Sequence, residues 1–152
     1  MNLSELYQEM ILDHNRKPRN FGKLESPTCY AHGVNPLCGD NFQLYLAVDK
    51  GGIIEKVAFE GTGCAISKSS ASMMTAAIKD KNVKEAGQLK DSFIHVLTDN
   101  SVSKDDQSRL GNLKIFEGVK NYPVRVKCAT LIWRTLEAAL KDGANIKEVS
   151  TE

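Results

Sequence analysis

Three cysteines and one aspartate in this chain stand where the sequence pattern changes from one kind of structure to another. Cys38 and Asp40 lie two positions apart in a Leu-Cys-Gly-Asp turn. Cys64 follows a Gly-Thr-Gly turn, and Cys128 follows an extended-looking run of aromatic, β-branched and basic residues. Three thiolates and one carboxylate form a ligand set that suits tetrahedral Zn²⁺ and could also serve iron-sulfur chemistry. The residue types therefore predict a metal centre with reactive thiols.

The spacing of these four residues differs from that of a zinc finger. Successive cysteines of the set are separated by 25 and then 63 intervening residues, so the tertiary fold would hold the metal rather than form around it. Aspartate is the weakest choice for a closed structural zinc site, which indicates a labile centre. The complete ligand set carries a net negative charge with Zn²⁺, and Arg125 and Lys127 are placed in the sequence to compensate it.

The positions of two cysteines also predict their reactivity. The first turn of a helix presents unpaired N–H groups and a positive dipole end, which favour a thiolate over a thiol. Cys64 and Cys128 each open a predicted helix, so we expect both pKa values to lie below the usual value of about 8.5. Gly61 and Gly63 permit positive φ angles, which would let the loop turn Cys64 back toward Cys38.

Residues outside this set have simpler interpretations. A free cysteine taken alone is more often a small buried hydrophobic residue than a ligand, and we adopt that interpretation for Cys29. His14 and His95 fit helix or strand positions facing the core or the solvent, and His32 fits a strand close to the turn. None of the three histidines lies beside a cysteine in the sequence.

Length and charge favour one cytoplasmic domain that recognises its partners locally. The chain has 152 residues, the usual size of a single domain. Its 20 basic and 19 acidic residues leave a formal charge of +1, which provides no general attraction for nucleic acid or an anionic membrane. No stretch approaches the roughly 18 uninterrupted apolar residues of a membrane span. Because a chain of this length can build its own core, we expect no disulfide framework.

Hydrophobic periodicity places the thiols between strands and helices. Alternating apolar residues on either side of an Asp-Lys-Gly-Gly turn predict an antiparallel hairpin. The predicted strands cover 28–34, 42–48 and 53–59. Helical spacing and end signals predict the helices. These cover 4–14, 67–80, 83–89, 104–119 and 128–143. The last ten or so residues are expected to form a flexible tail.

Four motifs together resemble one known family. They read DHNRKPRNFG at 13–22, LCGD at 37–40, GTGCAIS at 61–67 and RVKCATL at 125–131. In this order they are similar to the SufU and IscU family of iron-sulfur cluster assembly proteins, a NifU N-terminal-like family, and the resemblance spans nearly the whole chain. The three cysteine motifs are far more specific jointly than any one of them alone.

The resemblance favours the SufU branch of that family. The IscU branch has a histidine directly before its third cysteine, where this chain has Lys127. It also has an LPPVK chaperone-recognition segment just upstream, where this chain has Tyr-Pro-Val-Arg-Val at 122–126. A long segment at about 88–108, which is shorter in the IscU branch, points the same way.

The family resemblance implies a fold and a domain organisation. The implied fold class is α+β, with a three-stranded antiparallel sheet packed against several helices and the metal site at one exposed end. Residues 1–152 would form a single domain, with an insertion at about 88–108 and a flexible tail at about 143–152.

The resemblance also implies a function in iron-sulfur cluster assembly. The chain would be a zinc-bound sulfur acceptor that takes persulfide sulfur from a SufS-type cysteine desulfurase on Cys38. It would pass the sulfur on to downstream iron-sulfur assembly proteins, as a zinc-dependent sulfurtransferase that acts together with the desulfurase. A desulfurase histidine would replace Cys38 on the metal.

The ligands implied by the resemblance are the four residues of the cysteine and aspartate set, Cys38, Asp40, Cys64 and Cys128. Arg125 and Lys127 would have auxiliary roles near the site charge or the partner.

Three other functions are open at this level. The same four residues could hold a [2Fe-2S] cluster that is assembled on the chain and then transferred, with zinc as a placeholder. The chain could be a thiol hydrolase with Cys38 as nucleophile and His32 as base, which requires an imidazole within hydrogen-bond reach of the thiol. It could also be an inert interaction module stabilised by zinc, for which loss of Cys38 would destroy folding.

Overall fold

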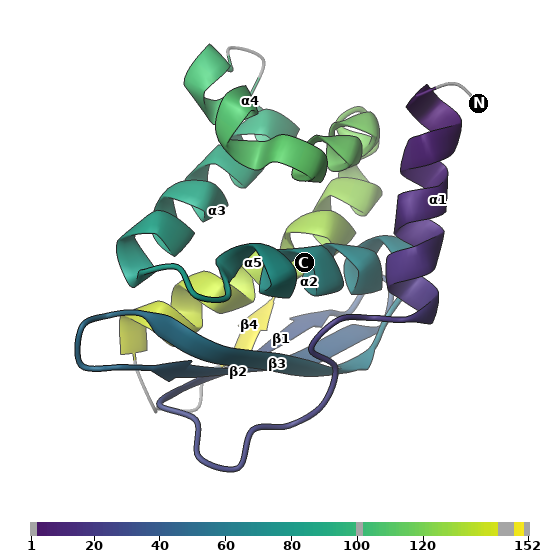
Figure 1. The fold of residues 1–152 in the computed structure, drawn as a ribbon. Coiled ribbons are helices and arrows are strands. Elements are labelled where there is room, and N and C mark those ends of the chain that lie inside the picture. Colours follow the sequence, from purple (N-terminus) through teal and green to yellow (C-terminus); the bar gives the residue numbers. More distant parts are fainter. Residues whose placement is uncertain (1–2, 100–101, 143–147, 151–152) are drawn as a thin grey trace.

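The fold is a four-stranded sheet whose one face is covered by helices (Figure 1). The computed structural model describes residues 3–99, 102–142 and 148–150. In chain order its elements are α1 (Leu3–Arg16), β1 (Cys29–Asn35), β2 (Asp40–Val48), β3 (Ile54–Thr62), α2 (Ala65–Ile78), α3 (Val83–Thr98), α4 (Lys104–Leu110), the 3₁₀ helix η1 (Gly111–Val119), α5 (Pro123–Asp142) and β4 (Glu148–Ser150). The predicted α+β class is confirmed.

The sheet has the order β3-β2-β1-β4, so β1 and β2 are its inner strands. The predicted antiparallel pairing of β1 with β2 and of β2 with β3 is confirmed. β4 adds to the free edge of β1 in parallel. Its residues fall in the segment predicted to be a flexible tail, but backbone pairing with 32–34 orders them. Residues 143–147 and 151–152 of that predicted tail lie outside the described residues.

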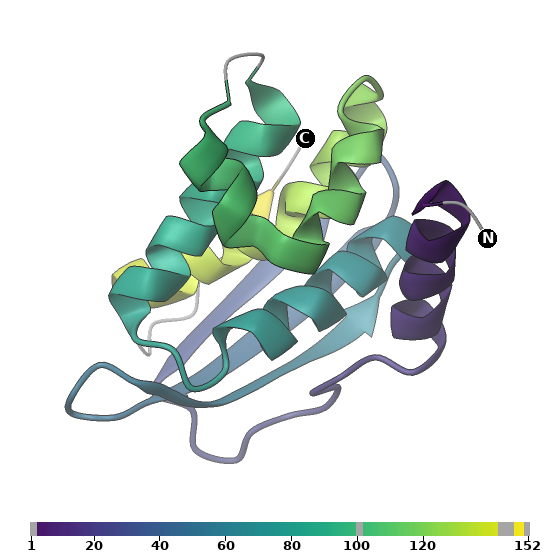
Figure 2. The same cartoon turned by 45° about the horizontal axis from the view of Figure 1, so that its top comes forward.

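The core lies between the sheet and two helices, α2 and α5. Phe42, Leu44 and Leu46 alternate along β2 and are completely buried against these helices, as the period of two along a strand requires. α5 contacts β1 and β2, and α2 contacts β3. α5 comes so close to β1 at Gly33 that a Cβ there would overlap the Thr135 side chain. A second helical layer of α3, α4 and η1 lies over α2 and α5 (Figure 2).

The helix α3 is much longer than the sequence pattern predicted. α3 was expected to end near residue 89 but runs to Thr98, because Phe93 and Leu97 bury their side chains in the core. The Phe93 ring stacks on Trp133 of α5, with 4.5 Å between ring centroids. Tertiary packing of this kind outweighs the weak local helix signal of the segment. Among the described residues, no helix is long and apolar enough to cross a membrane.

The start of α5 also corrects a prediction, and this correction affects the site. The run at 122–127 was predicted to be extended, with the helix opening at residue 128. The helix begins at Pro123 instead. Proline suits the first helical position, since its missing N–H is not needed there and its φ angle is already helical. Cys128 therefore lies in the second turn of α5 and not at its start.

Candidate metal centre

The turn between the inner strands presents the first thiol and the carboxylate. Asn35 ends β1, Asp40 begins β2, and the two are register partners. The backbone N–H of Cys38 donates a hydrogen bond to the carbonyl oxygen of Asn35 over 3.2 Å, which closes the turn. Gly39 has a φ of 72°, a left-handed conformation that side chains disfavour. Cys38 is exposed at the tip of the turn, whereas Asp40 is only 1% exposed and faces the helices.

Cys64 lies at the N-terminal cap of α2, as the sequence predicted. Its sulfur accepts a hydrogen bond from the backbone N–H of Ser67 over 3.4 Å, so the thiol takes the place of a capping hydroxyl. Its own backbone N–H donates to Oδ1 of Asp40 over 3.0 Å. Cys64 is exposed. The contact with Asp40 joins the end of β3 to the start of β2 at the site.

The two glycines before Cys64 act differently from one another. Gly61 has the predicted positive φ, 136°, and a Cβ there would overlap the backbone of Asn41 on β2. Gly63 does not have a positive φ angle, so the prediction is wrong for this second glycine. Its role is to provide space, because a Cβ at Gly63 would overlap both the Phe42 ring and the Ser67 side chain.

Cys128 is buried beneath the exposed thiol of Cys38. It is 3% exposed, and its sulfur lies 3.4 Å from the sulfur of Cys38. Burial raises the pKa of the Cys128 thiol, and the hydrogen bond with Cys38 and the negative charge of nearby Cys64 raise it further. The predicted lowering of this pKa is wrong, because Cys128 does not lie at a helix N-terminus. A bound cation would have to stabilise its thiolate.

The structure brings three of the four predicted residues into one group. The ligand atoms of Cys38, Asp40 and Cys128 all lie within 4.8 Å of one another. These residues come from the β1–β2 turn, the start of β2 and the second turn of α5. Cys64 is adjacent through its backbone contact with Asp40, but its sulfur faces the first turn of α2 and is not part of the group.

The chemistry of this group fits a zinc ion. Within the described part of the chain, Oδ2 of Asp40 is buried and has no hydrogen-bond partner. A buried, unpaired carboxylate oxygen costs about 1–3 kcal/mol or more, because it has lost its water without replacement. The sulfurs of Cys38 and Cys128, which are grouped with the Asp40 carboxylate, supply the soft ligands that zinc takes together with a carboxylate. A cation bound here would satisfy the oxygen and both sulfurs at once.

The two predicted auxiliary cations lie at the exposed start of α5. The guanidinium of Arg125 stacks over the ring of Tyr122, with 4.8 Å from its Cζ atom to the ring centroid. In the described residues, neither Arg125 nor Lys127 forms an ion pair with Asp40. Tyr122 and Val124 are about half exposed here, and Leu37 in the turn is 64% exposed. Exposed apolar and cationic side chains therefore lie on the two chain segments that carry Cys38 and Cys128.

Sequence reasoning missed one residue of the site, Asn35. Its side chain is completely buried, and its amide Nδ2 donates a hydrogen bond to the sulfur of Cys128 over 3.6 Å. Its Oδ1 is the other buried side-chain oxygen that has no hydrogen-bond partner in the described part of the chain. No periodicity or cysteine spacing marks this residue. The only sequence signal was its place at the end of a predicted strand, three residues before Cys38.

The remaining candidates have other surroundings. Nε2 of His32 lies 2.6 Å from Oδ1 of Asn41, on the sheet face opposite Asp40 and Asn35. This placement gives no support to the thiol hydrolase hypothesis. His14 lies in α1, where Nδ1 is 2.7 Å from Oγ of Ser72. His95 lies in α3, and Cys29 is a core residue, as predicted.

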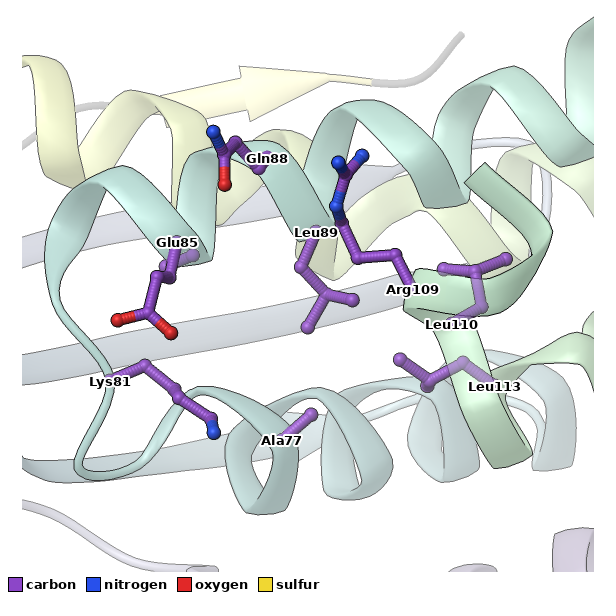
Figure 3. Close-up of a pocket in the computed structure, with 9 residues that line it drawn as sticks. Ala77, Lys81, Glu85, Gln88, Leu89, Arg109, Leu110 and Leu113 are labelled. Atoms are coloured by element: carbon purple, nitrogen blue, oxygen red, sulfur yellow. The ribbon is translucent and has the colours of Figure 1, made fainter. Parts of the chain in front are cut away.

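A separate pocket of about 290 Å³ lies between the C-terminal part of α2 and the helices α3, α4 and η1. Leu89 and Leu113 point into it, and Leu110, Arg109, Lys81 and Glu85 also line it (Figure 3). Cys64 caps the opposite end of α2. No cysteine lines this pocket, so it is not part of the thiol site.

Comparison with known proteins assigns the whole arrangement to a family. Residues 6–129 match the model of the NifU-like N-terminal domain. The chain is 41% identical over 146 residues to the zinc-dependent sulfurtransferase SufU of Bacillus subtilis (strain 168), covering 95% of this chain and 97% of that relative. It is 35% identical over 150 residues to the iron-sulfur cluster assembly scaffold protein IscU of Streptococcus pyogenes serotype M1, covering 99% and 92%. The crystal structure of FiSufU, a SUF-system protein from Fervidobacterium islandicum AW-1, superimposes with a TM-score of 0.82 at 37% identity, over 91% of this chain and 99% of that one.

Proposed function

Since the chain belongs to the NifU-like N-terminal domain family, we propose that it works in iron-sulfur cluster assembly as a zinc-dependent sulfur acceptor for a SufS-type cysteine desulfurase. One observation carries this proposal. An exposed thiol, Cys38, lies 3.4 Å from a buried thiol, Cys128, beside a buried carboxylate oxygen without a hydrogen-bond partner among the described residues. This arrangement would combine a metal site with a nucleophile that a partner protein can reach.

The ligands of the proposed centre are Cys38, Asp40, Cys64 and Cys128. The first, second and fourth are grouped within 4.8 Å, and rotation of the Cys64 side chain away from the Ser67 N–H would bring the third sulfur to the group. Bound zinc would keep the thiols deprotonated at neutral pH. Burial and neighbouring charge raise the pKa of the Cys128 thiol, so this residue needs that assistance.

The grouped ligands are held with different strength, which supports Cys38 as the one that leaves. Of the three grouped ligands, Asp40 is held by the N–H of Cys64 and Cys128 by the amide of Asn35. The sulfur of Cys38 has a hydrogen bond only with another thiol, and its side chain is exposed in a turn. Its departure would therefore break the fewest protein contacts.

The proposed reaction is a thiolate exchange. The Cys38 thiolate attacks the outer sulfur of the desulfurase persulfide, the sulfur–sulfur bond of that persulfide breaks, and the desulfurase leaves as a thiolate. A new sulfur–sulfur bond then joins the transferred sulfur to Cys38. No net oxidant is needed, because one persulfide is consumed and one is formed. A nucleophilic group supplied by the partner, such as a histidine, would take the metal position that Cys38 vacates.

The test is the turnover of a SufS-type cysteine desulfurase with and without this protein. We expect the natural chain to raise turnover and to gain one sulfur atom on Cys38, detected by mass spectrometry of the intact protein. A Cys38→Ala variant should fold and should leave turnover at the level of the desulfurase alone. Cys29→Ala removes a thiol in the core and serves as the matched control, which should stimulate like the natural chain.

Two results would contradict the proposal. If Cys38→Ala stimulates the desulfurase as well as the natural chain does, Cys38 is not the acceptor. If Cys38→Ala is unfolded by circular dichroism while Cys29→Ala is folded, the thiol has a structural role and the zinc-stabilised module becomes the better description.

A second candidate function is the assembly and transfer of a [2Fe-2S] cluster on the same residues. The observation that favours it is the 35% identity to a relative named as an assembly scaffold, over 99% of this chain. Protein purified without oxygen would then carry two irons and two sulfides per cluster, with visible absorbance, and would activate an apo-acceptor. Zinc at one ion per chain with no visible absorbance would instead support the sulfur acceptor.

A further inference from the structure

One residue, Asn35, contacts all three grouped residues, Cys38, Asp40 and Cys128. Its carbonyl oxygen accepts the backbone N–H of Cys38, its Cα is in register with that of Asp40, and its amide donates to the sulfur of Cys128. Its side chain is completely buried. It is the last residue of β1, an inner strand, and its backbone is held by its pairing with Asp40 of β2.

A buried asparagine at this position is costly unless its amide is used. The side chain offers two donors and one acceptor, and the acceptor Oδ1 has no partner among the described residues. An apolar side chain of similar shape would avoid the cost of that unsatisfied oxygen. The property that asparagine adds is therefore its N–H donor toward the Cys128 sulfur, 3.6 Å away.

We propose that Asn35 is a positioning residue that keeps Cys128 as the permanent sulfur ligand while Cys38 is exchanged. An N–H donor directed at a thiolate stabilises its charge and fixes its direction, as outer partners of metal ligands commonly do. Cys38 has no donor of this kind among the described residues. This inference deepens the proposed function and rests on it for the statement that Cys38 is the ligand that leaves.

The inference can be tested on zinc binding by the full-length protein. In Asn35→Leu the side chain stays similar in size but has no donor, and we expect the zinc affinity to fall about 10–100-fold. Affinity is measured by competition with a chromophoric chelator. Asn35→Asp, which also lacks the N–H and adds a negative charge beside the sulfur, should lose at least as much. Asn35→Gln retains an amide and should recover part of the affinity.

Asn41 provides the matched control, because it lies on the same hairpin but on the opposite face of the sheet. It is exposed and its Oδ1 is 2.6 Å from the His32 ring. Asn41→Asp adds the same charge as Asn35→Asp close to the turn without touching Cys128. We expect its zinc affinity to equal that of the natural chain.

Two further measurements separate positioning from a general loss of structure. With Co²⁺ in place of zinc, the sulfur-to-metal charge-transfer band should shift in Asn35→Leu and stay unchanged in Asn41→Asp. Alkylation of zinc-loaded protein, followed by peptide mass spectrometry, should label Cys38 first and Cys128 last in the natural chain. In Asn35→Leu the labelling rate of Cys128 should approach that of Cys38.

The inference is overturned if Asn35→Leu and Asn35→Asp both retain natural zinc affinity, an unchanged Co²⁺ spectrum and late labelling of Cys128. If Asn35→Leu does not fold, Asn35→Asp and Asn35→Gln decide by the same three measurements. None of these uses the desulfurase. A desulfurase test in which Cys38→Ala stimulates normally would refute the proposed function while leaving the effect of Asn35 on Cys128 to be judged by zinc and Co²⁺ binding.

Discussion

Two groups of buried polar side chains in this molecule differ in whether their hydrogen bonds are satisfied. The first is the set of hydroxyls along α2, which includes Ser70, Ser72 and Thr75, all completely buried. The second is the pair Asn35 and Asp40 at the ends of the β1–β2 turn. In the described part of the chain, the only buried side-chain nitrogen or oxygen atoms without a partner belong to this pair.

The hydroxyls of α2 connect secondary-structure elements. Oγ of Ser70 donates to the carbonyl oxygen of Ala129 over 2.6 Å and accepts the indole N–H of Trp133 over 3.1 Å. Oγ of Ser72 accepts the backbone N–H of Arg19 over 2.8 Å. Each of these bonds joins α2 to another segment. A fully satisfied buried network of this kind contributes to stability and fixes one arrangement of the helices.

This difference in hydrogen bonding separates buried polar groups that stabilise the fold from buried polar groups that a ligand could satisfy. Native proteins pair nearly all buried polar groups, so an unpaired one requires an explanation. At Asp40 a cation bound together with the neighbouring thiols, as proposed above, would provide that explanation. The same comparison predicts how each region responds to added metal and to substitution.

The largest expected change in the free energy of unfolding is the one caused by zinc binding. Because the ligand atoms are already gathered in the fold, zinc should bind the folded chain far better than the unfolded one. At free zinc about 1,000 times the dissociation constant, the free energy of unfolding should rise by about 4 kcal/mol. Chemical denaturation with and without zinc measures this rise. Cys128→Ser should lose most of it, and Cys29→Ala should keep it. Equal stability of the natural chain with and without zinc would contradict the metal site.

The second largest change in the free energy of unfolding is expected for the hydrogen-bonded hydroxyls of α2. Ser70→Ala removes the acceptor of the Trp133 indole N–H and leaves that donor buried without a partner. The free energy of unfolding should fall by about 2 kcal/mol, with or without zinc. Ser108→Ala in α4, which is exposed, is the control and should change stability little. A loss that appears only in zinc-loaded protein would show that the two regions are coupled.

The smallest expected change is a gain in the stability of metal-free protein, whereas Ser70→Ala should lower stability. Asp40→Asn retains an oxygen for the Cys64 N–H but replaces the unpaired charged oxygen by an uncharged amide. Metal-free protein should become more stable by about 1 kcal/mol, since a buried unpaired charge is removed. Zinc-loaded protein should become less stable, because one ligand is weakened. A destabilised metal-free variant would mean that Asp40 has a structural role like that of the α2 hydroxyls.

Much of the fold could be predicted from local patterns. The alternation of apolar residues along 42–48 gave the hairpin correctly, because one face of β2 is buried and a shift by one residue would expose it. The cluster of Cys38, Asp40 and Cys128 was predicted by their residue types and the motifs around them. The implied zinc ligation and the sulfur transfer stay predictions.

The parts that could not be predicted depend on contacts between distant segments. The pattern of Val124 and Val126 favoured a strand, but this segment forms the first turn of a helix that begins at Pro123, so the environment of Cys128 was misjudged. β4 forms only by pairing with β1, more than 100 residues earlier in the chain. Asn35 reaches Cys128 across 93 positions, a contact that no local pattern encodes.

The position of β1 and β2 inside the sheet has a consequence for repeated cycles of reaction. β1 and β2 both lie between other strands, so the turn at 36–39 extends from strands that are less free to fray than an edge strand is. Movement of Cys38 is then confined to its own side chain and the tip of the turn. If Cys38 carries sulfur as proposed, this support would favour the return of its thiol to the same position after each transfer. Under the proposed function, each reaction cycle would then begin from the same geometry without any rearrangement of the sheet.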